Sequence, residues 1–396
     1  MLRWLLPLAV LLPAPLAAAM APEPPAPLPD RMVLAPDAEA QWVPFELTPG
    51  NQIRFRMTID GRAATALLDT GFSQSVISRR WAKDAGLRIT EGGVGLGIGG
   101  SVAIGQVNGR SLVIGGLTRT GGRLGVLDLP DSATGNSTAI DVVIGGDLLR
   151  QYALDVDFAQ RRFRLLPSGR LPFAGQSAPL SIRGQLYISE MRVGETRLRP
   201  MIVDTGDGAT IAMSAEAWAS LGATRPATTT TVSFSVAGPV QSELAVLSEV
   251  AVGDAALRQA ETLIEASGGF SARMGSSGRI GTGFLQRFRV LLDPGAGRMV
   301  MAATTDTDRA PLRSTSGLLL GTEQDRLRVL HVMRGSPAAA GGWKPGEEIC
   351  GIDGAAVSTG YRSDPIAMWP AGAPGRVVKL RLCGGTTRAL TLARFY

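Results

Sequence analysis

Hydrophobic and polar residues alternate along much of this chain in short runs. The runs "RFRMTID" (54–60) and "TVSFSV" (231–236) have the period of two that is typical of strands with one buried face. The chain also contains 50 Gly and 25 Pro, and only 5% of its residues are aromatic. This composition favours many short strands joined by turns, so the pattern predicts an all-β fold with only short helices.

The strand pattern occurs twice. Residues 55–71 and 188–206 each read as a strand, a turn at Gly61 or Gly194, a second strand and then Asp-Thr-Gly. Each copy continues with a Trp inside a short predicted helix, whose N-cap is Ser78 or Ser214 and which ends at Gly86 or Gly222. Further on, "VVIGGDLL" in the first copy matches "GRIGTGFL" in the second. A repeat of this length indicates a duplicated domain.

The Asp of each copy stands where a buried apolar strand ends, in "LLDTG" and "IVDTG". A buried carboxylate is costly unless it is hydrogen-bonded or neutralised. Two such acids brought face to face by a duplicated fold can share one proton and hold a water molecule between them. The pattern therefore predicts that Asp69 and Asp204 belong to one site.

The scarcity of other reactive residues points the same way. The chain has one His and two Cys, so the sequence predicts no metal site and no cofactor. A Ser-His-Asp arrangement would need His331, which lies in the strand-like run "RVLHVM" far from any nucleophile-elbow pattern. If the chain is an enzyme, its catalytic residues must be carboxylic acids.

The formal net charge is +6. The basic residues are almost all Arg and are scattered, as in "RRFR" and "RLRP", rather than clustered with aromatic residues. This distribution indicates a solvated basic surface, and nucleic acid is not expected as a partner.

The first residues have the features of a secretory signal. Residues 1–19 carry Arg3, an apolar run broken by two prolines, and a small-residue end, so we expect cleavage after Ala19. The alternative is an uncleaved anchor, but the run is short for a bilayer. We expect residues 20–44 to form a Pro-rich lead-in, and we expect the protein to be periplasmic or secreted, without a membrane span after cleavage.

The paired motifs resemble those of retropepsin-like and pepsin-like aspartic proteases. The resemblance implies two acid-protease lobes in one chain, at residues 45–167 and 181–302, with linkers at 168–180 and 303–315. In that family each lobe supplies one catalytic Asp, each motif Thr hydrogen-bonds across to the other lobe, and glycines corresponding to Gly145 and Gly281 belong to strands behind the acids. The motif residues that the resemblance assigns to the site are Asp69, Thr70, Gly71, Asp204, Thr205 and Gly206.

The family covers its cleft with a mobile hairpin. "VGLGIGGSVAI" (94–104) and "TTVSFSVAGPVQS" (230–242) lie at the corresponding distance after each acid, and two such hairpins suit a retropepsin-type arrangement. The alternative is plain surface hairpins. The chain departs from the family where the residue after each motif is usually small, because Phe72 and Asp207 stand there. Phe72 cannot donate a side-chain hydrogen bond, and Asp207 would bring a third negative charge near the acids.

Residues 316–396 resemble a bacterial-type PDZ domain, through "SGLLLG", "GSPAAAGG", "KPGEEI" and an Ile-Asp-Gly turn. The resemblance implies that an extended peptide adds to a sheet edge, and that backbone N–H groups of Gly317, Leu318, Leu319 and Leu320 take its terminal carboxylate. The alternative is a structural brace. Cys350 and Cys383 fall on neighbouring strands of such a domain, so a disulfide and two free thiols both remain open.

Together these features predict a monomeric aspartic endopeptidase that acts on polypeptides, with its dyad active in acid. Two alternatives stay open. The lobes could bind peptides without cutting them, or they could pair between chains and form two sites per dimer.

Overall fold

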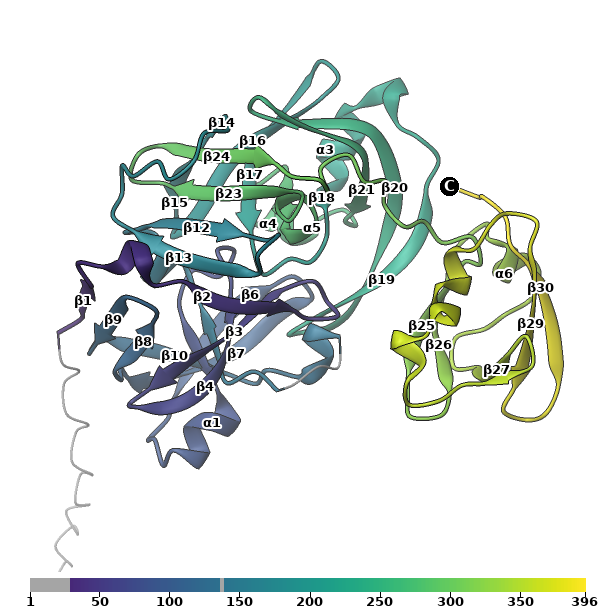
Figure 1. Ribbon diagram of the computed structural model, residues 1–396, viewed down its shortest axis with the longest axis horizontal. Coiled ribbons are helices and arrows are strands. Elements are labelled where there is room, and N and C mark those ends of the chain that lie inside the picture. The colour runs from purple at the N-terminus through teal and green to yellow at the C-terminus, as the bar shows by residue number, and fades with distance from the viewer. Residues whose placement is uncertain (1–28, 136–138) are drawn as a thin grey trace, which may run out of the picture.

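The computed structural model describes residues 29–135 and 139–396, and these residues are mostly β-strand with a few short helices, as the alternation predicts. Figure 1 shows a large β body and a smaller C-terminal module beside it. The expected signal sequence at 1–19 lies outside the described residues. Within the described part of the chain, no helix combines the length and the apolar character needed to cross a membrane.

The first β unit positions Asp69 at the end of a buried strand. Its hairpin consists of β3 (Ile53–Ile59) and β4 (Arg62–Leu68), and the odd-numbered side chains of β3 are buried. Strand β11 (Val142–Ile144) lies between β4, to which it is parallel, and β5 (Val76–Ser78), to which it is antiparallel. Strand β10 (Arg123–Leu127) then pairs with β5 in parallel.

The second β unit repeats these pairings around Asp204. The hairpin is β16 (Leu186–Val193) with β17 (Thr196–Asp204). Strand β22 (Gly278–Gly281) is parallel to β17 and antiparallel to β18 (Ile211–Met213), which in turn is parallel to β21 (Ala255–Ile264). The sequence repeat is therefore a repeat of strand topology.

Short helices follow each acid at the expected places. In α1 (Arg79–Asp84) the Trp81 N–H donates to Ser78 Oγ at 3.0 Å, and in α3 (Ala215–Ser220) the Ala217 N–H donates to Ser214 Oγ at 3.1 Å. Both predicted N-caps are confirmed. The remaining helical turns of the body are short: η1 (Ala38–Ala40), η2 (Asp131–Thr134), α2 (Gly146–Leu149), η3 (Gly222–Thr224), α4 (Phe270–Arg273) and α5 (Thr282–Leu285).

Each unit also carries a long hairpin after its acid. In the first unit the hairpin is β6 (Thr90–Gly97) with β7 (Gly100–Asn108), and in the second it is β19 (Thr229–Ser235) with β20 (Gly238–Val252). Both expected hairpins are therefore present. Their positions over the acids are described below.

The two units join through one shared sheet. Strands β12 (Ala153–Asp157) and β13 (Arg162–Leu166) of the first unit meet β23 (Phe288–Asp293) and β24 (Arg298–Ala303) of the second, and β12 pairs directly with β23. Fully buried Asp155 accepts hydrogen bonds here from Arg164 Nε (3.0 Å) and Arg289 NH2 (2.9 Å). The second of these ion pairs crosses between the units.

Segments expected as connections also add strands. Within residues 20–44, β1 (Arg31–Leu34) pairs with β9 (Leu117–Thr120), and β2 (Val43–Leu47) begins two residues earlier than the expected lobe. Within the expected linker, β14 (Gln176–Pro179) extends the shared sheet beside β24. The alternation missed β1 and β14 because they are edge strands of four residues. Two further short strands are β8 (Leu112–Ile114) and β15 (Ser181–Arg183).

The C-terminal module has its own sheet and its own apolar core. Its strands run in the order β25-β26-β27-β29-β30, with β28 beside β27. The core gathers around the buried side chains of Trp343, Trp369 and Leu392, separately from the body. The elements are β25 (Leu318–Thr322), β26 (Leu327–Val332), α6 (Pro337–Ala340), β27 (Glu348–Ile352), β28 (Ala355–Ala356), η4 (Tyr361–Ser363), η5 (Pro365–Ala371), β29 (Val377–Leu382) and β30 (Thr387–Thr391).

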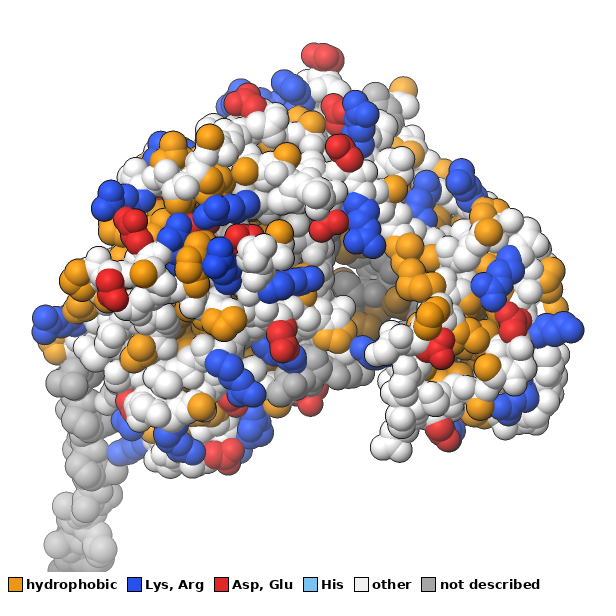
Figure 2. All heavy atoms as spheres, viewed as in Figure 1, with side chains coloured by type: hydrophobic (Ala, Val, Ile, Leu, Met, Phe, Trp, Pro, Cys, Tyr) orange, Lys and Arg blue, Asp and Glu red, His pale blue; other side chains and the backbone are white. Residues whose placement is uncertain are grey.

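The module contacts the body through strand β19. His331 lies in β26, as expected from its strand-like run, and its Nε2 is 2.8 Å from Thr230 Oγ1. Thr229 Oγ1 donates to the Arg334 carbonyl (2.7 Å), and the Arg334 guanidinium pairs with Glu243 of β20 (3.0 Å). The module is therefore attached to the hairpin of the second unit, and Figure 2 shows the molecular surface hollowed between module and body.

Candidate active site

The two Asp-Thr-Gly turns hold each other through buried threonines. Thr70 Oγ1 donates to the Val203 carbonyl (2.7 Å) and accepts from the Thr205 N–H (3.1 Å). Reciprocally, Thr205 Oγ1 donates to the Leu68 carbonyl (2.9 Å) and accepts from the Thr70 N–H (3.0 Å). Because both threonines are buried, these bonds satisfy backbone groups that water does not reach. The four bonds lock the turns of the two units together.

This arrangement brings the two carboxyl groups face to face across the glycines. A Cβ placed on Gly71 would lie 2.3–2.4 Å from the carboxyl atoms of Asp204, and one on Gly206 would lie 2.1–2.5 Å from those of Asp69. Such contacts are far below van der Waals separation, so only glycine fits at either position. The sequence-predicted site residues of both copies thus lie at one place in the fold.

The carboxyl groups differ in their hydrogen bonds. Asp204 Oδ1 accepts from the N–H groups of Gly206 (2.9 Å) and Asp207 (3.0 Å). Asp69 Oδ1 accepts from the Gly71 N–H (3.0 Å) alone. The Phe72 N–H donates to the Asp69 backbone carbonyl (3.3 Å), a bond that the Asp207 N–H also makes to the Asp204 carbonyl (3.3 Å). Hydrogen bonds from N–H groups stabilise the ionised form of an acid, so the Asp204 carboxylate is the better supported of the two.

Burial raises the pKa of both acids. The pKa of Asp69 rises well above its usual range, first through burial and then through the negative charge of Asp204. Burial and the charge of Asp207 raise the pKa of Asp204 to about 6, while the Arg279 guanidinium and the Gly206 N–H oppose the rise. Two carboxyl groups this close titrate as a pair, and the larger rise at Asp69 favours that acid as the holder of the shared proton.

A buried ion cluster stands beside Asp204. The Arg279 side chain is only 3% exposed, and its Nε lies 2.8 Å from Asp207 Oδ2 and 3.9 Å from Asp204 Oδ2. Its NH1 group pairs with Glu265 and donates to Ser271 Oγ (3.1 Å). Asp207 is therefore paired with Arg279, and its negative charge still raises the pKa of both acids, as expected from its place after the motif.

The corresponding position beside Asp69 is apolar. Val143 occupies the place in β11 that Arg279 occupies in β22, since each pairs with the residue two before its Asp. Phe72, which corresponds to Asp207, packs against a cluster that contains Leu67, Val76, Leu127, Ile140 and Val143. One side of the site is thus hydrophobic and the other is charged.

The two long hairpins meet across the acids. A Cβ on Gly99 would lie 2.6 Å from Ser235 Oγ and 3.0 Å from the Cβ of Ala237, so the hairpin tips are in contact. Ile98, at the first tip, packs against a cluster of the second unit that contains Phe270. These contacts show that the hairpins are not plain surface hairpins.

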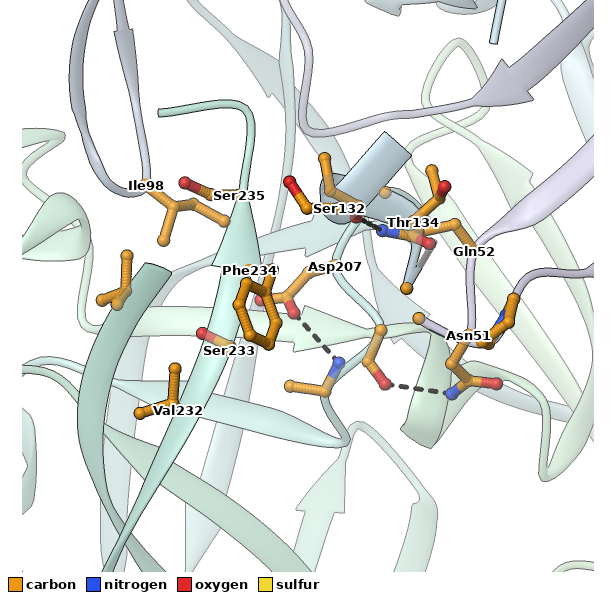
Figure 3. A pocket seen from close by; sticks show the side chains of 18 of the residues that line it. Asn51, Gln52, Ile98, Ser132, Thr134, Asp207, Val232, Ser233, Phe234 and Ser235 are labelled. Atoms are coloured by element: carbon orange, nitrogen blue, oxygen red, sulfur yellow. Dashed lines mark hydrogen bonds between the residues drawn. The ribbon is translucent and has the colours of Figure 1, made fainter. Parts of the chain in front are cut away.

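Acids, hairpins and module border one cavity of about 970 Å³. Figure 3 shows Asp207, Phe234 and Ile98 at this cavity, with Asn51 and Gln52 of the first unit on another side. The Asn51 side chain donates to the Gly208 carbonyl (2.9 Å), which links the two units beside the acids. From the module, the cavity is lined by residues that include Leu318, Leu319, Leu320, Gly321, Thr322 and Leu330.

The loop expected to take a carboxylate is closed on its own module. The N–H of Gly317 donates to Ser314 Oγ (2.9 Å), and the N–H of Leu318 donates to Ser316 Oγ (3.1 Å). The N–H of Ser316 donates to the Pro370 carbonyl (3.0 Å). Two of the four N–H groups expected to bind a carboxylate, those of Gly317 and Leu318, therefore already donate hydrogen bonds within the module. The resemblance did not predict this, because it did not consider the serine hydroxyls that accept them.

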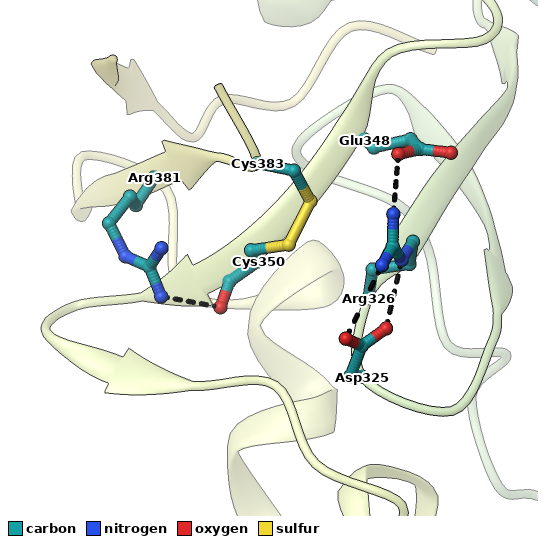
Figure 4. Close-up of a disulfide and its surroundings, with 6 residues drawn as sticks. All are labelled: Asp325, Arg326, Glu348, Cys350, Arg381 and Cys383. Atoms are coloured by element: carbon teal, nitrogen blue, oxygen red, sulfur yellow. Dashed lines mark hydrogen bonds and ion pairs between the residues drawn. A yellow bond between two sulfur atoms is a disulfide. The ribbon is translucent and has the colours of Figure 1, made fainter. Parts of the chain in front are cut away.

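The two cysteines are bonded to each other. Cys350 of β27 and Cys383, directly after β29, form a disulfide, and the Arg381 guanidinium donates to the Cys350 carbonyl beside it (2.9 Å; Figure 4). The bond joins two strands of the module and lies away from the acids. Among the described residues, no group of three or more His, Cys, Asp or Glu side chains could hold a metal ion.

Sequence reasoning missed Arg279 and Glu265. The signal for Arg279 was present, because "GRIG" has an arginine where the first copy has Val143 in "VVIG". Glu265 gave no comparable signal, since it follows β21 and reaches Arg279 only through the folded arrangement.

Comparison with protein families gives a match to part of the chain. A family model described as an aspartyl protease (Asp_protease_2) matches residues 55–148, a segment that contains Asp69, the first long hairpin and β11. No curated protein matches the chain. The matched segment is similar to aspartyl proteases, and this similarity supports protease activity in general.

Proposed function

We propose that this protein is an aspartic endopeptidase whose catalytic residues are Asp69 and Asp204. The observation that carries the proposal is the reciprocal bonding of Thr70 and Thr205, which holds two carboxyl groups face to face at the cavity. Two carboxyl groups with raised pKa values can share a single proton, and general acid–base chemistry on a bound water needs that state.

The surroundings of each acid suggest its role. Ionised Asp204, supported by two N–H groups and the nearby Arg279, takes a proton from a water molecule bound between the acids. The water oxygen attacks the peptide carbonyl carbon, while protonated Asp69 donates its proton to the carbonyl oxygen. The resulting tetrahedral intermediate collapses when Asp204 donates the proton it took from water to the leaving nitrogen and Asp69 takes back a proton from one hydroxyl of the intermediate, as the C–N bond breaks. Thr70, Gly71, Thr205 and Gly206 position the acids.

The wider architecture belongs to the same proposal. Residues 45–167 and 181–302 act as two retropepsin-like lobes of one chain, and residues 316–396 as a PDZ-like module that binds polypeptide. The repeated pairings around β11 and β22 support the two lobes, and the separate core of the module supports its independence from them. A periplasmic or secreted location remains part of the proposal, and the disulfide is consistent with an oxidising compartment.

The proposal is tested by incubating the purified protein with a mixed peptide library, with and without pepstatin. We expect cleavage inside the peptides that pepstatin blocks. Peptides that bind the protein and remain intact would instead identify a peptide-binding protein. Cleavage that pepstatin does not affect and that survives replacement of both acids by Asn would point to another site.

A further inference from the structure

Strand β21 of the second unit presents two acidic side chains to the cavity, and only one of them has a partner. Glu261, Leu263 and Glu265 occupy alternate positions at the end of this strand and line the same cavity as the two catalytic acids. Glu265 pairs with Arg279 and accepts from the N–H (2.7 Å) and the hydroxyl (3.0 Å) of Ser271. In the part of the chain that the structure describes, the Glu261 carboxylate makes no hydrogen bond or ion pair.

The surroundings of Glu261 leave its charge uncompensated. The residue is half-buried, and burial raises the pKa of its carboxyl group. Arg313 is the cation that opposes this rise, but its guanidinium lies over the ring of Tyr396, 4.8 Å from the ring centre. A carboxylate that is partly removed from water is costly without a partner. A cation that enters the cavity would supply the partner that Glu261 lacks.

The repeated strand topology does not require an acid at this position. The counterpart of Glu261 in the first unit is Arg123 of β10, because each stands two residues before the residue that pairs with the equivalent position of β18 or β5. Arg123 is exposed and does not line the cavity. The acid at Glu261 is therefore a property of the second unit and of its side of the cavity.

Strand geometry places Glu261 away from the catalytic acids along the cavity wall. Glu265 pairs with Arg279, whose Nε lies 3.9 Å from Asp204 Oδ2. Glu261 precedes Glu265 by four residues, which is about 13 Å along an extended strand at about 3.3 Å per residue. A bound substrate in extended conformation has the same rise per residue. Glu261 therefore faces a substrate residue several positions from the scissile bond.

We propose that Glu261 binds a cationic group of the polypeptide substrate, several residues from the scissile bond, and so selects substrates that carry a positive charge there. The inference rests on the proposed endopeptidase function. An ammonium or guanidinium group forms charge-assisted hydrogen bonds with a carboxylate, which are stronger than those between neutral groups. Two parts of a polypeptide supply such a cation, namely a Lys or Arg side chain and the N-terminal ammonium group, and the test below separates them.

The test uses one cleaved peptide that extends about six residues to each side of the scissile bond, about 20 Å at about 3.3 Å per residue. Each position in turn carries Lys or Gln, and every peptide is made with a free and with an acetylated N-terminus. We expect kcat/KM to be about ten-fold higher with Lys than with Gln at one position away from the scissile bond. An advantage that needs the free N-terminus and not the Lys would identify the ammonium group as the cation. No advantage from either cation would overturn the proposal.

Variants of Glu261 then assign the preference to this residue. Glu261→Gln keeps the shape of the side chain and removes its charge, so the ratio of kcat/KM between the cationic and the neutral peptide should fall from about ten to about one. Glu261→Lys should reverse the preference, in favour of a peptide with Glu at the same position. The matched control is Glu249→Gln, because Glu249 is an exposed acid of the neighbouring strand β20 that pairs with Arg258 (3.6 Å). The control should keep the wild-type ratio, and a ratio that survives Glu261→Gln would contradict the proposal.

Binding to the Asp69→Asn/Asp204→Asn protein provides a second measurement that does not depend on cleavage. This protein should bind the cationic peptide about ten-fold more tightly than the neutral peptide, and addition of Glu261→Gln should remove the difference. Equal Kd values for the two peptides would overturn the proposal. A ten-fold difference in Kd together with no cleavage of either peptide by the wild type would instead refute the endopeptidase function and leave the cation site in place.

Discussion

The two sides of the cavity are built on the same turn but from different chemistry. Beside Asp69 the turn continues into Phe72, and the neighbouring strand presents Val143, both within an apolar cluster. Beside Asp204 the turn continues into Asp207, and the equivalent strand position holds Arg279, which is buried against Asp207 and Glu265. The backbone repeats while the side chains around each acid do not.

In the proposed mechanism this difference gives two equivalent acids different roles. An apolar surrounding disfavours a charged carboxylate, whereas N–H donors and a guanidinium favour one. Asp69 is therefore the better place for the shared proton, and Asp204 the better place for the negative charge. The same difference gives the cavity one hydrophobic and one polar side, which would select different substrate side chains on either side of the scissile bond.

Removing Arg279 should have the largest effect on stability. Arg279→Met leaves Asp207 and Glu265 buried without the cation that they share, and we expect it to lower the free energy of unfolding by about 3–5 kcal/mol, measured by urea denaturation. The matched control is Arg197→Met, because Arg197 is exposed and its pair with Glu190 lies on the surface. The control should change stability by less than about 1 kcal/mol. Equal effects of the two variants would contradict the buried-cluster account.

Removing Asp207 should shift the pH dependence of cleavage. The pKa values of both acids are raised in part by the charge of Asp207, so Asp207→Ser should lower both. The proposed mechanism requires Asp204 ionised and Asp69 protonated, which places the acidic limb of the wild-type kcat/KM profile near pH 6, higher than the acid range expected from the sequence. In the variant we expect both limbs to move to lower pH by about one unit, a change of about 1.4 kcal/mol. Unchanged limbs would mean that the acids do not sense Asp207.

Changing Phe72 should alter specificity on the apolar side only. Phe72→Ser reduces the apolar surface available to a bound side chain, and we expect kcat/KM to fall about ten-fold for substrates with a large apolar residue next to the scissile bond, from a loss of about 1.4 kcal/mol. Substrates with Ala at that position serve as the control and should change little. A uniform fall for both substrates would show that Phe72 supports the fold and does not contact the substrate.

The helix caps should be the feature in which the two units agree. Ser78→Ala and Ser214→Ala each remove a hydroxyl that accepts a hydrogen bond from an N–H in the first turn of a helix. We expect each variant to lower the free energy of unfolding by about 1 kcal/mol. Ser101→Ala on the exposed face of the first hairpin is the control, with an expected change within about 0.5 kcal/mol. Markedly unequal effects of the two cap variants would argue against equivalent packing of the two helices.

The sequence was sufficient for the features that the two copies share. Alternation predicted the strands, and the aligned copies predicted the turns at Asp69 and Asp204, the capping serines and both long hairpins. It was insufficient where packing between distant segments decides the outcome. Glu265 reaches Arg279 only in the folded chain, and the hydroxyls of Ser314 and Ser316 close a loop whose motif suggested open N–H groups. Local sequence patterns cannot show which acceptor will take a hydrogen bond from a given N–H when folding brings the two together.

The activity of the two single Asn variants tests the shared site most directly. With one dyad per chain, Asp69→Asn and Asp204→Asn should each lower kcat by about a thousand-fold or more, and the double variant should be no worse than either. Mixing the two single variants should restore nothing, because both acids come from one chain.

Folding is checked by urea denaturation of the same variants. The raised pKa of Asp204 means that its stabilising effect is present below about pH 4 and is lost as the pH rises through about 6. At neutral pH the Asp204→Asn protein should therefore be at least as stable as wild type. If either single variant is folded and keeps a substantial share of wild-type kcat, or if the mixture regains activity, then Asp69 and Asp204 do not form one shared-proton site within the chain.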